Sequence, residues 1–349
     1  MVHGQKITKK NVLTSNNFAR IADVVYAEEI PDQDYNELKT EHTFKIRSIN
    51  GYTLYKTLKF TLFENCIIFC HLDFVHGLFQ HLENVTEFKN INLITSQSDT
   101  SVTKKLFRKK PKCVSRWFST NVEYAHSNLI PIPLGIANLR NTKNIIFEDY
   151  VNIDTVKTKK DTIFANFNIN TNYLHRYNAL KKFINNESLV IGKPTQGYLE
   201  YLNNLANSKF TLSPWGNGYD THRIWESLYA GSIPITKNHQ TFSNFSNLPI
   251  VLLDSYNDFS KNDIAKIKFE DINYEALTIN WWKNIIKGNL KEDYKKAKLF
   301  EEDDKKNYEV ISLYQKKIKQ INMLKKIYTN SRKLHKKILG KKINDLISI

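Results

Sequence analysis

The sequence predicts an α/β protein with parallel β-sheets in two domains, followed by a basic helical extension. Three observations lead to this prediction. Short apolar runs alternate with amphipathic segments over most of the chain, which is typical of strands connected by helices. The chain has 349 residues, more than one ordinary domain holds, and 41% of them are hydrophobic, which allows a substantial core. In the last part, lysines separate apolar residues at helical spacing.

The apolar runs give the expected strands, and the amphipathic segments between them give the expected helices. Strands are expected at residues 66–70, 91–95, 129–133, 162–167, 189–191, 210–213, 233–236 and 250–253. Helices are expected at residues 75–82, 172–185, 197–207 and 221–229. Connections of this length imply βαβ units and parallel sheets, because two parallel strands need a long crossover between them.

A polar stretch at residues 138–160 breaks the apolar pattern and predicts a linker between the two domains. We therefore expect an N-terminal domain at residues 1–150 and a C-terminal domain at residues 151–300. Residues 301–349 form a basic tail. Its apolar residues recur mostly three or four positions apart, which predicts one or two amphipathic helices.

The formal net charge of +16 is concentrated in that tail, where residues 308–343 hold ten Lys and one Arg against one acidic residue. The rest of the chain is only mildly basic, so we expect no nucleic-acid partner. Nucleic-acid binding by the lysine-rich helices is kept as an alternative function. Contact of the tail with an anionic membrane surface is another interpretation of the same charge.

The three cysteines, Cys66, Cys70 and Cys113, form no CxxC pair and predict reduced thiols in the core. An odd number of thiols and the polar start MVHGQKITKK indicate a reducing cytoplasm rather than secretion. No apolar run approaches the roughly 20 residues that cross a bilayer. We expect a cytoplasmic protein, or one attached peripherally to the inner face of a membrane.

The most informative stretch is SPWGNGYDTHRIWESLYAGSIP at residues 213–234. It follows a predicted strand, and Gly216 and Gly218 give its loop the backbone freedom of a tight turn. Asp220 or Thr221 is suited to cap the helix that follows. The next strand begins directly after this helix, which completes a β–loop–α–β unit. Open α/β sheets bind ligands at the carboxyl ends of such strands.

The start of this helix suits a phosphate, because its unpaired N–H groups carry partial positive charge. Arg223 adds a forked cationic donor that matches a diphosphate. Glu226, one turn deeper, can accept hydrogen bonds from the two hydroxyl groups of a ribose. Together they predict a nucleoside diphosphate that carries a leaving group. The alternative is a surface ion pair between Arg223 and Glu226.

The segment GNGYDTHRIWESLYAGSIPI closely resembles the C-terminal signature of exostosin-like glycosyltransferases, with Arg223 and Glu226 at the Arg and Glu of that signature. The segments IIFCHLDFVHGLF, LITSQSD, RWFSTN, IPIPLGIAN and TIFANFNINTNYLHR look like the bacterial and viral branch of this family. More distantly, the stretch resembles fucosyltransferases, which remain an alternative, but it lacks their Glu-Lys pair. The resemblance is strongest over residues 205–240, patchy over residues 60–180 and absent from the tail.

The resemblance implies a GT-B architecture, with two Rossmann-like domains and a cleft between them. The C-terminal domain would bind a nucleotide-sugar donor, and a glycan or lipid-linked acceptor would enter from the N-terminal domain. Members are inverting, so a base on the N-terminal domain must deprotonate the acceptor hydroxyl. Asp73 and Asp99 are the candidates for this base, each with a helix N-cap as the alternative. His71 and His76 are weaker candidates.

The candidates for the donor site follow the expected strand ends of the C-terminal domain. They are Asn166, Asn168, Thr171, Arg176, Ser213, Gly216, Asn217, Gly218, Asp220, Thr221, His222, Arg223 and Glu226. Arg223 is also expected to stabilise the leaving diphosphate during the reaction. For the asparagines, an Asn-rich loop without function is the alternative. Arg116 and Asn138 are weaker candidates to line the same cleft from the other domain.

One string, Asp32-Gln33-Asp34, has the DxD form of the metal site in the other main glycosyltransferase fold. It follows Pro31 and opens a polar segment, so it predicts the start of a helix rather than a metal site. The sequence has no HxxxH, HExxH or Cys/His cluster. We therefore expect no metal and no cofactor, with Arg223 and the helix N-terminus neutralising the diphosphate instead.

Overall fold

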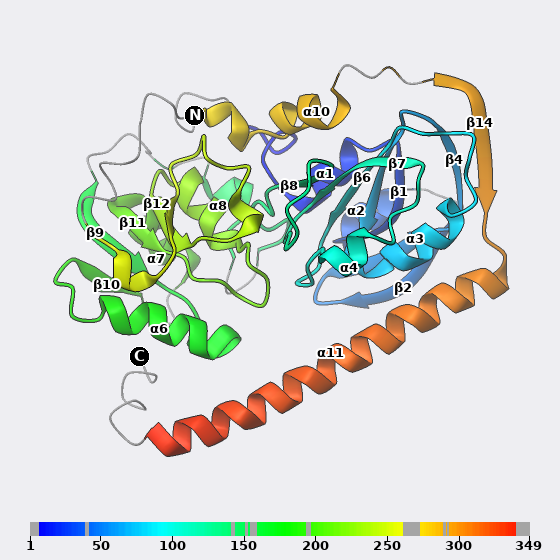
Figure 1. Cartoon of the computed structure of the whole chain (residues 1–349). Helices are drawn as coiled ribbons and strands as arrows, with labels where there is room; N and C mark the ends of the chain where they lie inside the picture. Colours follow the sequence, from blue (N-terminus) through cyan, green and yellow to red (C-terminus); the bar gives the residue numbers. More distant parts are fainter. Residues whose placement is uncertain are drawn as a thin grey trace.

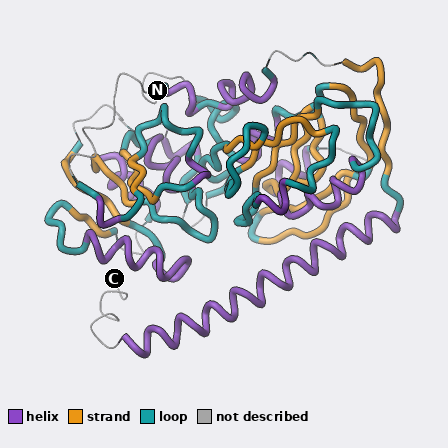
Figure 2. Tube along the Cα trace, in the orientation of Figure 1, coloured by secondary structure: helices purple, strands orange, loops and turns teal. Residues whose placement is uncertain are grey.

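The structure is a computed structural model that describes residues 7–38, 42–140, 144–150, 153, 159–192, 197–260, 273–288, 291 and 293–339. The protein is mixed α/β with parallel sheets, as the sequence predicts. Its strands form two main sheets at opposite ends of the molecule, and one long helix, α11 (Asp304–Leu339), runs along both (Figure 1; Figure 2).

The first sheet has the strand order β2-β3-β1-β5-β6-β7-β8. Its strands are β1 (Val24–Pro31), β2 (Thr43–Ile49), β3 (Tyr52–Thr57), β5 (Ile67–His71), β6 (Ile91–Ser96), β7 (Val114–Ser119) and β8 (Leu129–Pro131). Strands β1, β5, β6, β7 and β8 are parallel, whereas β3 and β2 add an antiparallel edge.

Helices cover both faces of this sheet, which explains the continuous apolar runs of its central strands. Every residue of β5 and β6 is buried. Phe69 of β5 belongs to a core that includes α1 (Ser15–Arg20), while its neighbour Cys70 belongs to the core under α3 (Val75–Leu82). Adjacent residues of a strand point to opposite faces, so the two helices lie on opposite sides of β5.

The second sheet is entirely parallel, with the strand order β10-β9-β11-β12-β13. Its strands are β9 (Lys160–Ala165), β10 (Leu189–Ile191), β11 (Ser208–Leu212), β12 (Ile233–Lys237) and β13 (Val251–Leu253), and its helices are α6 (Tyr173–Phe183), α7 (Tyr198–Asn207) and α8 (His222–Tyr229). Every strand and helix that the sequence predicts for the two sheets is found within about two residues of its expected ends.

The remaining elements are short, apart from β14. They are α2 (Asp32–Glu37), β4 (Lys59–Glu64), η1 (Leu72–Phe74), α4 (Lys104–Phe107), α5 (Phe147–Tyr150), η2 (Ile169–Asn172), η3 (Gln240–Phe242), η4 (Tyr256–Asp258), η6 (Tyr274–Leu277), α10 (Ile279–Lys287) and β14 (Asp293–Glu301). The predicted helix start at Asp32 is confirmed, since α2 begins there. The Asp32 carboxylate accepts hydrogen bonds from Ser48 and Thr53. Helix α5 falls within the expected linker.

After the second sheet, the chain returns to the first. Trp282 of α10 packs edge-on against Phe18 of α1, with ring centroids 6.4 Å apart. Strand β14 then pairs antiparallel with β4, and Phe300 stacks on Phe60 at 5.5 Å. Helix α10 and, apart from Glu301, strand β14 fall within the range 151–300 predicted for the C-terminal domain, but they pack on the first half of the molecule.

Helix α11 is attached to both halves. Just before it, the buried Glu302 forms an ion pair with the equally buried Lys56 and accepts a hydrogen bond from Tyr26. Along its first turns, Tyr314 stacks on Phe74 at 4.5 Å. Further along, the Tyr328 hydroxyl accepts a hydrogen bond from the backbone N–H of Tyr173 at 2.6 Å, beside the second sheet. The described part of the predicted tail forms one continuous helix over Asp304–Leu339, where the sequence predicts one or two.

One hydrophobic core joins the two halves. Trp225 of α8 packs edge-on against Phe245, Phe245 against Trp282 of α10, and Trp282 against Phe18 of α1. The three cysteines are buried and free, as predicted. Across the described ranges, no helix combines the length and apolar character needed to cross a membrane.

Candidate functional site

A cavity of about 860 Å³ lies where the carboxyl ends of the two sheets face each other. It brings together most of the candidates that the sequence singles out: Asp99, Asn138, Asn166, Asn168, Thr171, Arg176, Gly216, Asn217, Gly218, Asp220, Thr221, His222, Arg223 and Glu226. Five candidates, Asp73, His71, His76, Ser213 and Arg116, lie outside the lining. The crevice at the carboxyl ends of parallel strands is the usual ligand site of such sheets.

Two arginines on the side of the second sheet form the cationic part of the cavity. Arg176 of α6 is 6% exposed and donates to the backbone carbonyls of Trp215 and Asn168, both at 2.8 Å. Its guanidinium carbon and that of Arg223 lie 5.6 and 5.9 Å from the centroid of the Phe167 ring. Burial, and then the charge of Arg223, lower the pKa of Arg176 to about 9. A bound anion would offset this repulsion.

The first turn of α8 presents unused polar groups to the same space. Thr221 is the N-cap residue, as predicted, but its side chain makes no capping hydrogen bond. Both Thr221 Oγ1 and Arg223 Nε are buried and have no hydrogen-bond partner among the described residues. Buried polar atoms are normally paired, so these two atoms mark a position where a ligand can bind. Gly216 keeps the space open, because a Cβ there would lie 3.1 Å from Arg176 Nη2.

Glu226 lies one turn deeper and is 1% exposed. Its carboxylate accepts hydrogen bonds from the Tyr201 hydroxyl at 2.7 Å and from the backbone N–H of Ile145 at 3.3 Å. Burial raises the pKa of Glu226, and the charge of Arg223 opposes that rise. The alternative of a surface ion pair with Arg223 is therefore wrong, because the carboxylate is buried and bonded to other groups while still lining the cavity.

Asp220 connects the two sheets rather than pointing freely at a ligand. Its carboxylate accepts hydrogen bonds from the backbone N–H of Leu134 at 2.8 Å and from the Trp225 indole at 2.9 Å. Burial raises its pKa to about 7. Its own N–H donates to Asn121 Oδ1 at 2.9 Å. A Cβ at Gly218 would approach Asn121 Nδ2 to 2.7 Å, so the second glycine of the loop is needed for this contact.

Asn121 is a cavity residue that the sequence analysis missed. It follows β7, adopts a left-handed conformation with φ of 50°, and lines the cavity. The only signal was its position at the end of the RWFSTN segment. His222, a predicted candidate, also contacts the first half of the chain, with Nδ1 2.7 Å from the Gly135 carbonyl oxygen.

On the side of the first sheet, Asp99 and Glu29 bring carboxylates to the lining. Asp99 Oδ2 accepts a hydrogen bond from Asn217 Nδ2 at 3.1 Å, across the cavity. Glu29, at the end of β1, forms an ion pair with Arg47 at 2.9 Å. Glu29 was not a candidate in the sequence analysis, because the polar residues of VVYAEEIP interrupt the apolar pattern by which a strand is predicted.

Asp73 does not line the cavity and is hydrogen-bonded to other residues. Its carboxylate accepts hydrogen bonds from Lys317 of α11 at 2.7 Å and from Ser98 at 2.8 Å, and its side chain is 8% exposed. Burial acts to raise the pKa of Asp73, but the charges of His71 and Lys317 and these hydrogen bonds outweigh it and lower the pKa. The capping alternative does not apply to Asp73 either, because His71 is the residue that caps η1.

Ser213 and Arg116 have structural roles. Ser213 is fully buried, and its N–H donates to the carbonyl of Ile235 at 2.9 Å. Arg116 donates to the carbonyls of Ile285 and Ile286 at the end of α10. Its place in the cleft was a wrong expectation, since it joins β7 to the returning chain instead.

No group of three or more His, Cys, Asp or Glu side chains that could hold a metal ion occurs among the described residues.

Comparison with known proteins adds one finding. Residues 169–259 match the family model described as the RXYLT1 C-terminal domain. The matched range runs from η2 to just past η4 and contains Arg176, Arg223 and Glu226. The match supports a glycosyltransferase family, without support for a bacterial and viral branch. No curated protein matches the chain significantly.

Proposed function

We propose that this protein is an inverting, metal-independent glycosyltransferase of the GT-B type. It would transfer a sugar from a nucleoside diphosphate donor to a hydroxyl group of a glycan or lipid-linked acceptor, in the synthesis of a polysaccharide or glycoconjugate. The observation that carries the proposal is the pair of adjacent arginines, Arg176 and Arg223, in a cavity at the carboxyl ends of two sheets. The family match over residues 169–259 supports the same activity.

The donor diphosphate fits between the two guanidinium groups and the start of α8. Arg223 has an unpartnered Nε there among the described residues, and Thr221 has an unpartnered hydroxyl. Glu226, at the deeper end, would accept hydrogen bonds from the ribose. The cavity volume of about 860 Å³ lies in the range of small-molecule sites. Because the matching family model belongs to a xylosyltransferase, a xylose-bearing donor is the first to test.

Asp99 is the base that the geometry favours. It lines the cavity from the first sheet, whereas Asp73 is bonded to Lys317 and Ser98. In the proposed step, Asp99 takes the proton of the acceptor hydroxyl, whose oxygen bonds to the anomeric carbon. The bond from that carbon to the diphosphate breaks, and its electron pair leaves with the diphosphate. Arg176 and Arg223 stabilise the charge that develops on this leaving group.

Calorimetric titration with a nucleoside diphosphate tests the donor site. We expect Arg223→Ala to weaken binding by roughly 10- to 100-fold, since it removes a charged hydrogen-bond donor. Glu226→Gln should weaken it by roughly 1–3 kcal/mol for the same reason. Arg108→Ala removes an exposed arginine outside the cavity and is the matched control. If both cavity variants fold and bind the nucleotide as tightly as the wild type, the donor site lies elsewhere.

The base is tested separately, at saturating donor. Asp99→Asn should reduce transfer on the order of 100-fold or more, with little change in nucleotide affinity. Asp73→Asn should reduce transfer much less. The reverse order would assign the base to Asp73.

A further inference from the structure

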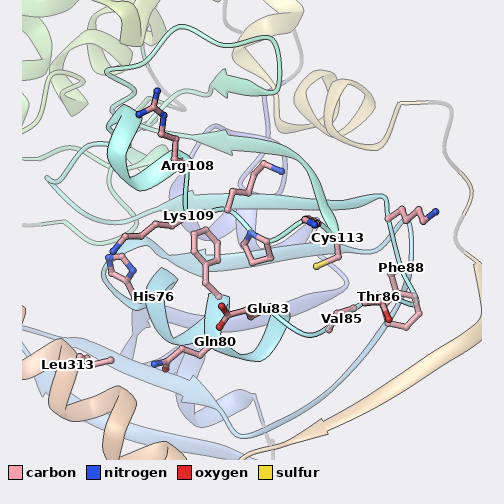
Figure 3. Close-up of a pocket in the computed structure, with 15 residues that line it drawn as sticks. His76, Gln80, Glu83, Val85, Thr86, Phe88, Arg108, Lys109, Cys113 and Leu313 are labelled. Atoms are coloured by element: carbon pink, nitrogen blue, oxygen red, sulfur yellow. The ribbon is translucent and has the colours of Figure 1, made fainter.

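A second cavity, of about 1050 Å³, lies away from the cleft, between α3, the chain that follows α4, and α11. Its apolar floor includes Phe79, Phe88 and Cys113, which are buried. Leu313 of α11 closes one side and is 43% exposed. Figure 3 shows these walls, with Leu313 at the lower left, beside Gln80, and Lys109 above them.

The rim of this cavity is basic. Arg108, Lys109 and Lys112 come from one short segment, RKKPK, and all three are exposed. Lys110, between them, donates to the Val114 carbonyl and holds the segment in place. Lys109 and His76 point toward one another in Figure 3. Burial lowers the pKa of His76, and the charge of Lys109 lowers it further. The rim therefore concentrates positive charge that an anion would offset.

Beyond Leu313, helix α11 exposes two more aliphatic residues on the same side of the helix. Leu324 and Ile327 are 62% and 56% exposed, and with Leu313 they fall within about 60° around the helix axis. The helix packs on α3 and η1 through a different side, which carries the buried Val310 and Tyr314. Of the three aliphatic residues, only Leu313 lines the cavity; Leu324 and Ile327 lie about 16 and 21 Å further along the helix axis, at 1.5 Å per residue. A row of exposed aliphatic side chains on one side of a helix that borders a basic cavity is typical of an interaction surface.

We propose that this combined surface, defined by Arg108, Lys109, Lys112, Leu313, Leu324 and Ile327, docks on an anionic phospholipid membrane. The basic rim binds lipid phosphates, and the aliphatic row enters the boundary between headgroups and acyl chains. A nucleic acid fits less well, because Phe79 and Phe88 are 6% and 1% exposed and cannot stack on bases. An aliphatic row also offers nothing to a phosphodiester chain.

Co-sedimentation of the full chain with vesicles tests the proposal. Vesicles that contain phosphatidylserine should bind the wild type at low salt, and vesicles of phosphatidylcholine alone should bind it much less. The double substitution Lys109→Gln/Lys112→Gln should lower the partition coefficient on phosphatidylserine vesicles roughly tenfold or more. Leu324→Gln/Ile327→Gln should lower it about fivefold or more.

Matched controls separate this surface from general charge attraction. Lys181→Gln/Lys182→Gln removes the same charge from exposed positions of α6. Tyr308→Gln removes an apolar group that is 75% exposed on α11, about 140° around the helix from Leu313. Both control variants should change vesicle binding less than twofold. All of the variants, controls included, should leave the nucleotide affinity of the cleft within twofold of the wild type.

Three outcomes would overturn the proposal. If Lys181→Gln/Lys182→Gln lowers the partition coefficient as much as Lys109→Gln/Lys112→Gln does, vesicle binding is nonspecific charge attraction and not a property of this surface. Phosphoserine that binds at the rim, without any vesicle binding, would make it a site for soluble anions. An RNA oligonucleotide that binds the wild type and loses affinity on Lys109→Gln/Lys112→Gln, with vesicle binding unchanged, would assign the surface to nucleic acid.

Discussion

The guanidinium groups of Arg176 and Arg223 lie near the same Phe167 ring, and burial, followed by the charge of Arg223, lowers the pKa of Arg176. Holding two like charges in a buried place costs free energy in the absence of ligand. A guanidinium also forms two parallel hydrogen bonds to a phosphate, which an ammonium cannot do. The arrangement therefore suits a diphosphate whose negative charge increases as its bond to the sugar breaks.

This argument predicts how substitutions of Arg223 rank. Arg223→Ala should lower turnover on the order of 100-fold or more, and Arg223→Lys should recover only part of that loss, because a point charge does not reproduce the fork. Initial rates of donor turnover give both values, with Arg108→Lys as the control for an arginine outside the cleft. A lysine variant as fast as the wild type would show that charge alone is needed at this position.

Asp220 makes stability depend on pH. Burial raises its pKa from an ordinary 3.8 to about 7, so the folded protein holds a proton there that the unfolded chain has released. Its contribution to stability is complete below about pH 3.8 and is lost as the pH rises through about 7. Urea unfolding at pH 5 and pH 8 should show this decrease in the wild type. Asp220→Asn should be less stable overall, through its changed hydrogen bonds, but should lose this part of the pH dependence. If the free energy of unfolding falls equally between pH 5 and pH 8 in both proteins, Asp220 is not the source of this pH dependence.

At the scale of elements, the sequence predicts the buried parallel strands well because both of their faces are apolar. It misses two parallel strands that hold charged residues, β7 with Arg116 in VSRWFS and β1 with Glu28 and Glu29 in VVYAEEIP. Glu28 is fully buried, but it pairs with Arg20 and accepts a hydrogen bond from Tyr55, and both partners lie on other elements. It also misses the pairing of β14 with β4, which joins segments far apart in the chain and leaves no local pattern.

The two halves of the candidate site differ in how far the sequence predicts them. In the second-sheet half, Arg223 and Glu226 lie in one continuous segment with a recognisable loop and helix, so they could be selected from the sequence. The first-sheet half is assembled from the ends of separate strands. Glu29, Gln97 and Asn121 line the cavity, but no spacing relates them in the chain.

The packing of α11 on α3 depends on Gly77. A Cβ there would lie 2.8 Å from Val310 Cγ1 of α11 and 3.2 Å from the Tyr26 hydroxyl. Gly77→Ala should therefore lower the free energy of unfolding by about 1–3 kcal/mol, the usual cost of overpacking. It should also make α11 more sensitive to limited proteolysis.

Gly197 provides the control for that substitution. A Cβ at Gly197 meets nothing within 4 Å, and its φ of −66° suits alanine. Gly197→Ala should change stability by less than about 0.5 kcal/mol. If Gly77→Ala is equally neutral, α11 is not held against α3 as the structure describes.

At the scale of the whole molecule, the two sheets are joined on several sides of the cavity. The shared core and the bonds from Asp220 to Leu134 and Asn121 lie at its base. Helix α11 connects η1 and α3 to Tyr173 near the second sheet. A donor that bridges arginines of the second sheet and polar groups of the first would add to these connections, so its binding should stabilise the entire fold rather than one half.

Thermal unfolding measures that coupling and also tests the proposed independence from metal. At a nucleoside diphosphate concentration of about 100 times Kd, mass action adds about 2.7 kcal/mol, which for a chain of this length raises Tm by about 3–4 °C. The shift should be the same in EDTA and in Mg²⁺, because Arg176 and Arg223 supply the positive charge that a cation supplies in other enzymes. Arg223→Ala should reduce the shift in both buffers, while Arg108→Ala should keep it. A shift that appears only with Mg²⁺ or Mn²⁺, together with transfer that EDTA abolishes and Mn²⁺ restores, would mean that the arginines hold a metal-bound diphosphate and do not replace the metal.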